Sequence, residues 1–244
     1  MTQTLLVDQL IISYHLFTGT SDHVLLFLHG RGRKKEDWES YFWALEKNQI
    51  SFLALDFPGF GGSELPKEIR GVQEYSAFVL QALDKLDIRQ PVEIVAHSFG
   101  GRIAFYLAAN FPEKVKKLRL IAPGGVEKEI SKTKKWMFSI GKTLLPQKAQ
   151  QQLKHRISSS DYQNAGKLEP IFKKVVNEDL RMLFPQITQP VRLYRWEQDD
   201  QIEQRQIKIM EEGLPNVTLK TFPNLGHDLH QEKAEEVLSD ILAK

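Results

Sequence analysis

The sequence contains no cysteine and no long uninterrupted apolar run. Without cysteine, disulfides, a cysteine nucleophile and thiolate metal ligands are excluded, and a reducing compartment is compatible with the composition. A membrane-spanning helix needs about 18 or more consecutive apolar residues, a length that no segment reaches. Residues 1–8 also lack the basic and apolar regions of a signal peptide. We therefore expect a cytoplasmic protein without a membrane span.

The sequence also lacks an excess of charge of one sign. Its 244 residues include 33 Lys and Arg against 31 Asp and Glu, which gives a formal net charge of +2. This balance gives no reason to expect a nucleic acid or a membrane surface as partner. With 41% hydrophobic residues, the chain can bury a large core as one domain, or as one domain with an insertion. Nothing in the sequence indicates an oligomeric state.

Strand-like and helix-like segments alternate through most of the chain. Strands are expected twice within 3–17 and near 23–28, 50–55, 92–96, 117–121, 191–196 and 217–222, and helices near 36–47, 73–86, 202–212 and 230–242 and between residue 98 and Pro112. Most of the strand segments are short and continuously apolar, which is typical of parallel strands covered on both sides. The pattern predicts an α/β fold with a mostly parallel, eight-stranded sheet flanked by helices.

The alternation stops between about 126 and 185. No strand-like run is present there, and lysines and arginines crowd the first half, interleaved with apolar residues such as Trp136 and Phe138. A structureless loop of this length is uncommon in a compact domain. We therefore interpret 126–185 as a helical lid, or cap, inserted into a core domain formed by 1–125 and 186–244. The basic residues are compatible with an anionic substrate, although a solvated face is the more common explanation.

Ser98 stands where an apolar strand segment gives way to a helical pattern. Ala96 and Gly100, two positions to either side, are small. A serine on so sharp a turn has a strained backbone, and bulky neighbours at those two positions would collide. The turn exposes the hydroxyl and directs the first helical N–H groups towards an oxyanion. The pattern is weak alone, but its flanking strand and helix favour Ser98 as a nucleophile over an ordinary buried serine.

A serine nucleophile needs a base, and histidine is suited to this task because its unperturbed pKa is about 6.5. Three of the seven histidines, His29, His97 and His227, follow or end predicted strands, where reactive groups gather in a parallel sheet. His97 adjoins Ser98 and should point away from its hydroxyl, whereas His29 lies on the loop needed for the oxyanion. We predict His227 as the base, with His230 as an alternative that is expected at the surface.

The base needs an acid that fixes its tautomer and stabilises the imidazolium. Glu197, Asp199 and Asp200 follow the strand predicted at 191–196, whereas residues 122–125, which follow the strand predicted at 117–121, include no acid. We predict Asp199, with Asp200 and then Glu197 as alternatives. The unused aspartate is expected to cap the helix that begins near Gln201.

The sequence resembles lid-bearing serine hydrolases of the α/β-hydrolase fold. The oxyanion loop of that family resembles residues 29–32, its D-x-P-G-x-G-x-S loop 56–63, its elbow 96–101, its G-x-x-D acid turn 196–200 and its terminal G-H 226–227. The order Ser98, Asp199, His227 is the family's order of nucleophile, acid and base. In two departures, Ala96 replaces the usual first glycine of the elbow and Trp196 replaces the glycine of the acid turn, which leaves Asp200 open as the acid.

The resemblance implies an oxyanion hole made by the backbone N–H groups of Phe99 and Arg31, and no metal or organic cofactor. It implies a carboxylesterase-like enzyme in which His227 deprotonates Ser98, the alkoxide attacks a small-molecule acyl substrate, and water hydrolyses the acyl-enzyme. C–C bond hydrolysis of a β-diketone-like substrate and a non-catalytic binding module of the same fold are the alternatives. We expect the Arg31 side chain to face solvent and that of Arg102 to be structural.

Overall fold

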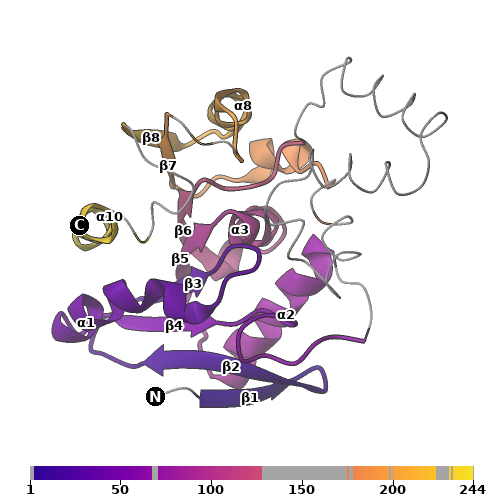
Figure 1. Ribbon diagram of the computed structural model, residues 1–244, viewed down its shortest axis with the longest axis vertical. Helices are drawn as coiled ribbons and strands as arrows, with labels where there is room; N and C mark the ends of the chain where they lie inside the picture. The colour runs from indigo at the N-terminus through magenta and orange to yellow at the C-terminus, as the bar shows by residue number, and fades with distance from the viewer. Residues whose placement is uncertain are drawn as a thin grey trace, which may run out of the picture.

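The computed structural model describes residues 3–67, 71–127, 175, 178–197, 199, 201–223, 231 and 233–243. Eight strands form one sheet: β1 (Gln3–Val7), β2 (Leu10–Phe17), β3 (Val24–Leu28), β4 (Ser51–Leu55), β5 (Val92–His97), β6 (Val115–Ile121), β7 (Val191–Trp196) and β8 (Val217–Phe222). Helices cover both faces of this sheet (Figure 1).

The strand order is β1-β2-β4-β3-β5-β6-β7-β8. β2 pairs antiparallel with β1 and β4, and every other neighbouring pair is parallel. The predicted α/β fold with a mostly parallel, eight-stranded sheet is therefore confirmed. All residues of β3, β4 and β5 are buried, as expected for short apolar strands in the middle of a sheet that helices cover on both sides.

Two helical layers enclose the sheet. One layer contains α1 (Glu39–Lys47), which follows the 3₁₀ helix η1 (Lys35–Trp38), and α10 (Ala234–Leu242); the other contains α2 (Val72–Lys85), α3 (Phe99–Asn110) and α8 (Gln204–Gly213), with the 3₁₀ helices η2 (Pro112–Lys114) and η4 (Arg181–Gln186). Each layer packs on its own cluster of buried apolar side chains. The two clusters are separated by the sheet.

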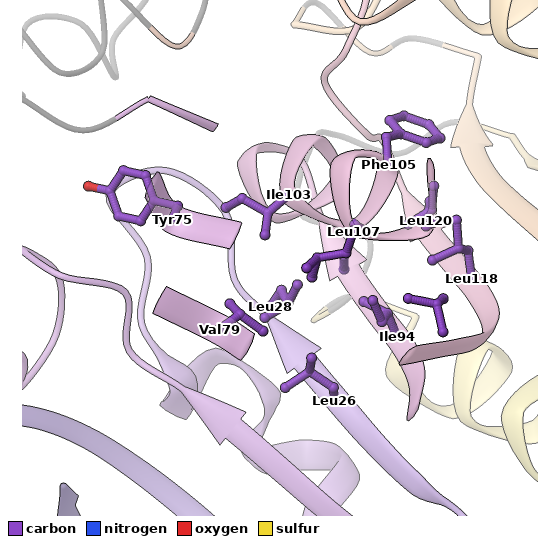
Figure 2. Close-up of a cluster of buried hydrophobic side chains, with 14 of the residues drawn as sticks. Leu26, Leu28, Tyr75, Val79, Ile94, Ile103, Phe105, Leu107, Leu118 and Leu120 are labelled. Carbon is purple, nitrogen blue, oxygen red and sulfur yellow. The ribbon is translucent and has the colours of Figure 1, made fainter. Parts of the chain in front are cut away.

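Strand alternation divides the core between these layers. Leu26 and Leu28 of β3 point into the cluster beneath α2 and α3, whereas Leu25 and Phe27 of the same strand point into the cluster beneath α1 and α10. Figure 2 shows the first cluster, in which Leu28 lies close to side chains of α3 and α2. Because β3, β5 and the helix α3 share this cluster, core packing fixes the connection between β5 and α3.

A helix boundary differs from the predictions, and the lid lies largely outside the residues that the structure describes. The closing helix, expected from residue 230, begins at Ala234, because Lys233 has a non-helical backbone with φ −124° and ψ 33°. Most of the predicted lid, 128–174 and 176–177, lies outside the described residues. The described end of that segment, from Glu178, leads into η4, which packs against α3 and α8.

A buried polar network attaches α10 to the sheet. Arg119 of β6 forms an ion pair with Glu93 of β5 and donates a hydrogen bond to the backbone oxygen of Asp240 at 2.8 Å. The Tyr194 hydroxyl donates to the Asp240 carboxylate at 2.5 Å. Partial burial favours the neutral acid, but the Tyr194 hydrogen bond and the Arg192 charge outweigh it and lower the pKa of Asp240. This network fixes the helix that follows the predicted histidine loop.

Candidate active site

Ser98 has a strained backbone between the end of β5 and the start of α3, with φ 47° and ψ −105°. Such a conformation costs a non-glycine residue about 1–3 kcal/mol and persists only where the surroundings impose it. The Ser98 N–H donates to the carbonyl of Ile121 at 3.0 Å, and the Ser98 carbonyl accepts from the Gly124 N–H at 2.9 Å. The structure thus contains the sharp strand-to-helix turn that the sequence predicts, and Ser98 is partly exposed.

The glycines after the serine allow the turn to lie close to its neighbours. A Cβ on Gly100 would lie 2.4 Å from the Leu28 carbonyl oxygen, and one on Gly101 would lie 2.5 Å from Cβ of Pro123. The Gly100 N–H also donates to the carbonyl of His29 at 3.2 Å. Gly100 is therefore required by close packing, as predicted, and Gly101 is a second such position that the motif alone did not identify.

Phe99 supplies the first N–H group of α3. An α-helix leaves its first N–H groups without intrahelical acceptors, so this amide is placed to bind an anion at the helix N-terminus. The Phe99 side chain is buried and packs edge-on against Tyr75, with ring centroids 5.1 Å apart. The Phe99 side chain therefore packs in the core, while its backbone N–H remains at the start of α3.

His29 is held neutral at the start of the predicted oxyanion loop. Its Nδ1 donates to the Gly30 carbonyl at 2.7 Å, and its Nε2 accepts from the Phe57 N–H at 3.0 Å. Burial lowers the pKa of His29 to about 4. Because both ring nitrogens are engaged and the ring is buried, His29 is suited to hold the loop and not to accept a proton from Ser98.

Arg31 itself is partly buried, in a turn whose Arg33 N–H donates to the Gly30 carbonyl at 3.2 Å. His97 is buried, and a Cβ on Gly30 would lie 2.5 Å from its Nδ1. The elbow and the loop after β3 are thus in direct contact, and glycine is required at residue 30 for that contact.

Asp199 is the predicted acid that the structure describes. Its Oδ1 accepts hydrogen bonds from the N–H groups of Gln201 at 2.7 Å and Ile202 at 2.9 Å. The expectation that an aspartate caps the next helix was wrong, because α8 begins only at Gln204 and its preceding residue is Glu203. Two amides instead fix the orientation of the Asp199 carboxylate. Asp200, His227 and His230 lie outside the described residues.

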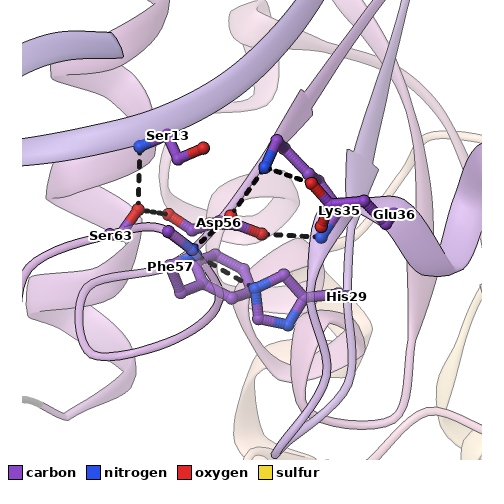
Figure 3. A network of polar contacts seen from close by, with 8 residues as sticks. Ser13, His29, Lys35, Glu36, Asp56, Phe57 and Ser63 are labelled. Atoms are coloured by element: carbon purple, nitrogen blue, oxygen red, sulfur yellow. Dashed lines mark hydrogen bonds and ion pairs between the residues drawn. The ribbon is translucent and has the colours of Figure 1, made fainter. Parts of the chain in front are cut away.

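Asp56 and Lys35 form a buried ion pair that the sequence analysis missed (Figure 3). Lys35 Nζ lies 3.0 Å from Asp56 Oδ2, and the Lys35 N–H donates to Oδ1 at 2.6 Å. The Asp56 side chain is fully buried, and a Cβ on Gly61 would lie 2.3 Å from its Oδ2. The D-x-P-G-x-G-x-S pattern marks Asp56, but no pattern distinguishes the buried Lys35 from the exposed Lys34 before it.

Arg102, one turn into α3, lies close to Gly124, just before the segment predicted as the lid, and to Glu178, in the last part of that segment. Its Nη1 donates to the Glu178 carbonyl at 2.6 Å, and a Cβ on Gly124 would lie 2.7 Å from its Nε. The Leu180 N–H donates to the Gly125 carbonyl at 2.8 Å. Burial lowers the pKa of Arg102 to about 10, so it stays charged at neutral pH. Arg102 has the structural contacts that the sequence analysis expects.

The part of the chain that the structure describes holds no group of three or more His, Asp or Glu side chains that could bind a metal ion. Within the same residues, no helix is both long and apolar enough to cross a membrane. The groups described above are a serine on a strained turn, the N–H groups at the start of α3 and a carboxylate held by two amides.

A family model described as the alpha/beta hydrolase fold matches residues 23–154, which is more than half of the chain. The chain belongs to this family. The match includes the oxyanion loop, the Asp56 loop and the Ser98 elbow, so the motifs that carry the resemblance in the sequence lie largely within it.

Individual relatives of this α/β hydrolase differ in their named activities. The 2-hydroxymuconate semialdehyde hydrolase of Pseudomonas sp. strain CF600 is 34% identical over 107 residues, covering 42% of this chain and 37% of that protein. A bacterial membrane phospholipase A has a TM-score of 0.79 at 24% identity, covering 100% of this chain and 84% of the other. An esterase of Exiguobacterium antarcticum has a TM-score of 0.76 at 20% identity, covering 100% and 98%.

The structural likenesses concern the fold, because the sequence identities are low. The chain also spans only about a third of the length of the curated relatives that it matches first, 32% and 38% in two examples. Family membership is therefore established, whereas the activity has to be argued from the site.

The depressed pKa of His29 predicts a pH-dependent stability. The folded-state pKa of about 4 lies below the unfolded value of about 6.5, so only the unfolded state binds the proton between these values. This term is fully present above pH about 6.5 and is lost as the pH falls towards about 4, at a cost of about 3 kcal/mol. In His29→Gln, whose side-chain oxygen can still accept from the Phe57 N–H, the unfolding free energy should fall less over this range.

Urea unfolding of both proteins at several pH values measures this difference. Parallel curves of unfolding free energy against pH would show that His29 titrates in the folded protein as it does in the unfolded chain.

Proposed function

We propose that this α/β hydrolase is a serine hydrolase that acts through an acyl-enzyme on a small carboxylic ester or related acyl substrate. The carrying observation is the strained backbone of Ser98, with φ 47° at the N-terminus of α3. A positive φ destabilises a non-glycine residue, and such strained residues cluster at functional sites. The turn also brings the serine hydroxyl beside the N–H groups of the helix.

In the proposed reaction, Ser98 attacks the substrate carbonyl while His227 accepts the hydroxyl proton. Asp199 orients the imidazole and stabilises its charged form. The proton then passes to the leaving group, and water hydrolyses the acyl-enzyme with His227 acting again as base. Two backbone amides hold Oδ1 of Asp199 at 2.7 and 2.9 Å, which supports a carboxylate of fixed orientation in this role.

The proposed oxyanion hole consists of the N–H groups of Phe99 and Arg31. Phe99 lies at the N-terminus of α3, where the helix dipole favours negative charge. The loop that contains Arg31 is attached to the elbow by the bond between the Gly100 N–H and the His29 carbonyl. Each oxyanion donor is typically worth about 3 kcal/mol in the transition state. The donors are backbone groups, so the chemistry does not depend on the side chains of these two residues.

Substrate selection is assigned to the segment 126–185, which we propose is a helical cap over the core formed by 1–125 and 186–244. Arg102 on α3 contacts Gly124, just before this segment, and donates to the Glu178 carbonyl in its last part. A segment that leaves and rejoins the core beside Ser98 is well placed to form part of the substrate pocket.

A second candidate activity is hydrolysis of a C–C bond in a β-diketone-like substrate. The 34% identity over 107 residues to a 2-hydroxymuconate semialdehyde hydrolase favours it. The two candidates are separated by comparing kcat/KM for a short-chain nitrophenyl ester with that for a ring-fission dienoate. A higher kcat/KM for the dienoate would assign the enzyme to C–C bond hydrolysis, with Ser98 still as the proposed nucleophile.

Replacing Ser98 by alanine should abolish ester hydrolysis. Loss of the nucleophile leaves only binding and oxyanion stabilisation, so kcat for a short-chain nitrophenyl ester should fall by at least about 1,000-fold. The matched control is Ser239→Ala, an exposed serine on α10, which should keep wild-type activity. Equal rates for wild type and Ser98→Ala would contradict the proposal.

Asparagine substitutions should identify the acid. Asp199→Asn leaves the size of the side chain unchanged but removes the charge that stabilises the imidazolium, and it should lower kcat by roughly 1,000- to 10,000-fold. Asp200→Asn is the matched variant and should stay within about 10-fold of wild type, a loss that corresponds to about 1.4 kcal/mol. A large loss with Asp200→Asn alone would move the assignment to Asp200.

A further inference from the structure

The loop between β3 and η1, residues 30–34, is held at both ends by one other loop. At its start, the His29 ring joins the Gly30 carbonyl, at 2.7 Å, to the Phe57 N–H, at 3.0 Å. At its end, both the N–H and Nζ of Lys35 bind the carboxylate of Asp56, at 2.6 and 3.0 Å. Figure 3 shows that these contacts converge on residues 56 and 57. The Arg31 N–H lies between the two attachment points.

The holding loop is itself fixed to the sheet. The Asp56 N–H donates to the Ser13 carbonyl of β2 at 2.9 Å. The Ser63 hydroxyl donates to the Asp56 carbonyl at 2.8 Å and accepts from the Ser13 N–H at 3.0 Å. The Gly62 N–H donates to Asp56 Oδ2 at 2.9 Å. The N–H, the carbonyl and the carboxylate of Asp56 thus each have a hydrogen bond besides those to Lys35, and Figure 3 shows the one from Ser63.

Stability alone does not explain a charged pair at this position. Asp56 is 0% and Lys35 only 4% exposed, and a buried ion pair is often no more stabilising than apolar residues of the same size. The pair does provide directional hydrogen bonds, because the carboxylate accepts from two backbone N–H groups as well as from the ammonium. Such an arrangement fixes the path of the loop backbone more narrowly than apolar packing.

We propose that Lys35, Asp56 and His29 are positioning residues of the oxyanion hole, which hold the Arg31 N–H in line with that of Phe99. This inference rests on the proposed function, because it assigns these residues to the oxyanion of that reaction. A donor is effective only at about 2.7–3.1 Å from the developing oxyanion, so a loop that shifts by an ångström loses most of the benefit.

Two variants weaken the attachment of the loop without touching the donor. Lys35→Met keeps the length of the side chain and the backbone N–H bond to Asp56 but removes the ammonium. Asp56→Asn keeps the shape of the side chain but places an amide where an oxygen now accepts. The control is Leu83→Ala, which creates a cavity in the core beneath α2 and changes neither loop.

With p-nitrophenyl acetate, the Lys35 and Asp56 variants should lower kcat by about 10- to 100-fold and change KM by less than about two-fold. Inhibition by a trifluoromethyl ketone, whose adduct with serine carries an oxyanion, should weaken by the same factor as kcat/KM. The Leu83→Ala protein should unfold at lower urea concentration but keep its kcat. A role in stability alone would give all three variants wild-type kcat and inhibitor affinity, which would overturn the proposal.

Hydrogen exchange tests the positioning without activity. In folded Lys35→Met and Asp56→Asn proteins, amides of residues 30–34 should exchange at least about 10-fold faster than in wild type, while those of β5 stay unchanged. Unchanged exchange at 30–34 would also overturn the proposal. A wild-type protein that neither hydrolyses the ester nor binds the ketone would instead reject the proposed function, and the exchange result would still decide whether these residues hold the loop.

Discussion

The positive φ of Ser98 is tolerated because backbone groups on both sides of the turn are bonded to neighbouring parts of the sheet. Ile121 at the end of β6 accepts from the Ser98 N–H, and Gly124 beyond it donates to the Ser98 carbonyl. The same turn needs a glycine at residue 100, because the Leu28 carbonyl occupies the space of a side chain. These bonds and this close approach are the surroundings that hold Ser98 in its strained conformation.

Around that turn, buried polar groups organise the loops that the sheet alone leaves unsupported. Neutral His29 and the carboxylate of Asp56 hold the loop after β3, and charged Arg102 joins α3 to the Glu178 carbonyl. Each group is buried and hydrogen bonded, so each has one strongly preferred geometry. Directional hydrogen bonds therefore hold the loop after β3 and the segment around Glu178.

Runs of apolar or small residues predicted the strands and the Ser98 turn, because these features depend on residues close together in the sequence. Continuous apolar runs identified β3 and β5 because strands covered on both faces leave no polar alternation, and the small residues around Ser98 revealed the elbow because steric crowding permits little else. Features that depend on residues distant in the sequence could not be predicted. Lys35 is buried because it pairs with Asp56, whereas the neighbouring Lys34 is exposed. The starts of α8, after Glu203, and of α10, after Lys233, also differ from the predictions. The backbone conformation of single residues decides where a helix begins.

Peptide mapping after treatment with a fluorophosphonate shows whether the elbow serine is an activated nucleophile, since these reagents modify serines whose hydroxyl is deprotonated by a neighbouring base and whose adduct is held by oxyanion donors. We expect a single stoichiometric adduct on Ser98, lost in the His227→Ala protein. An unmodified Ser98, or equal modification with and without His227, would contradict this expectation.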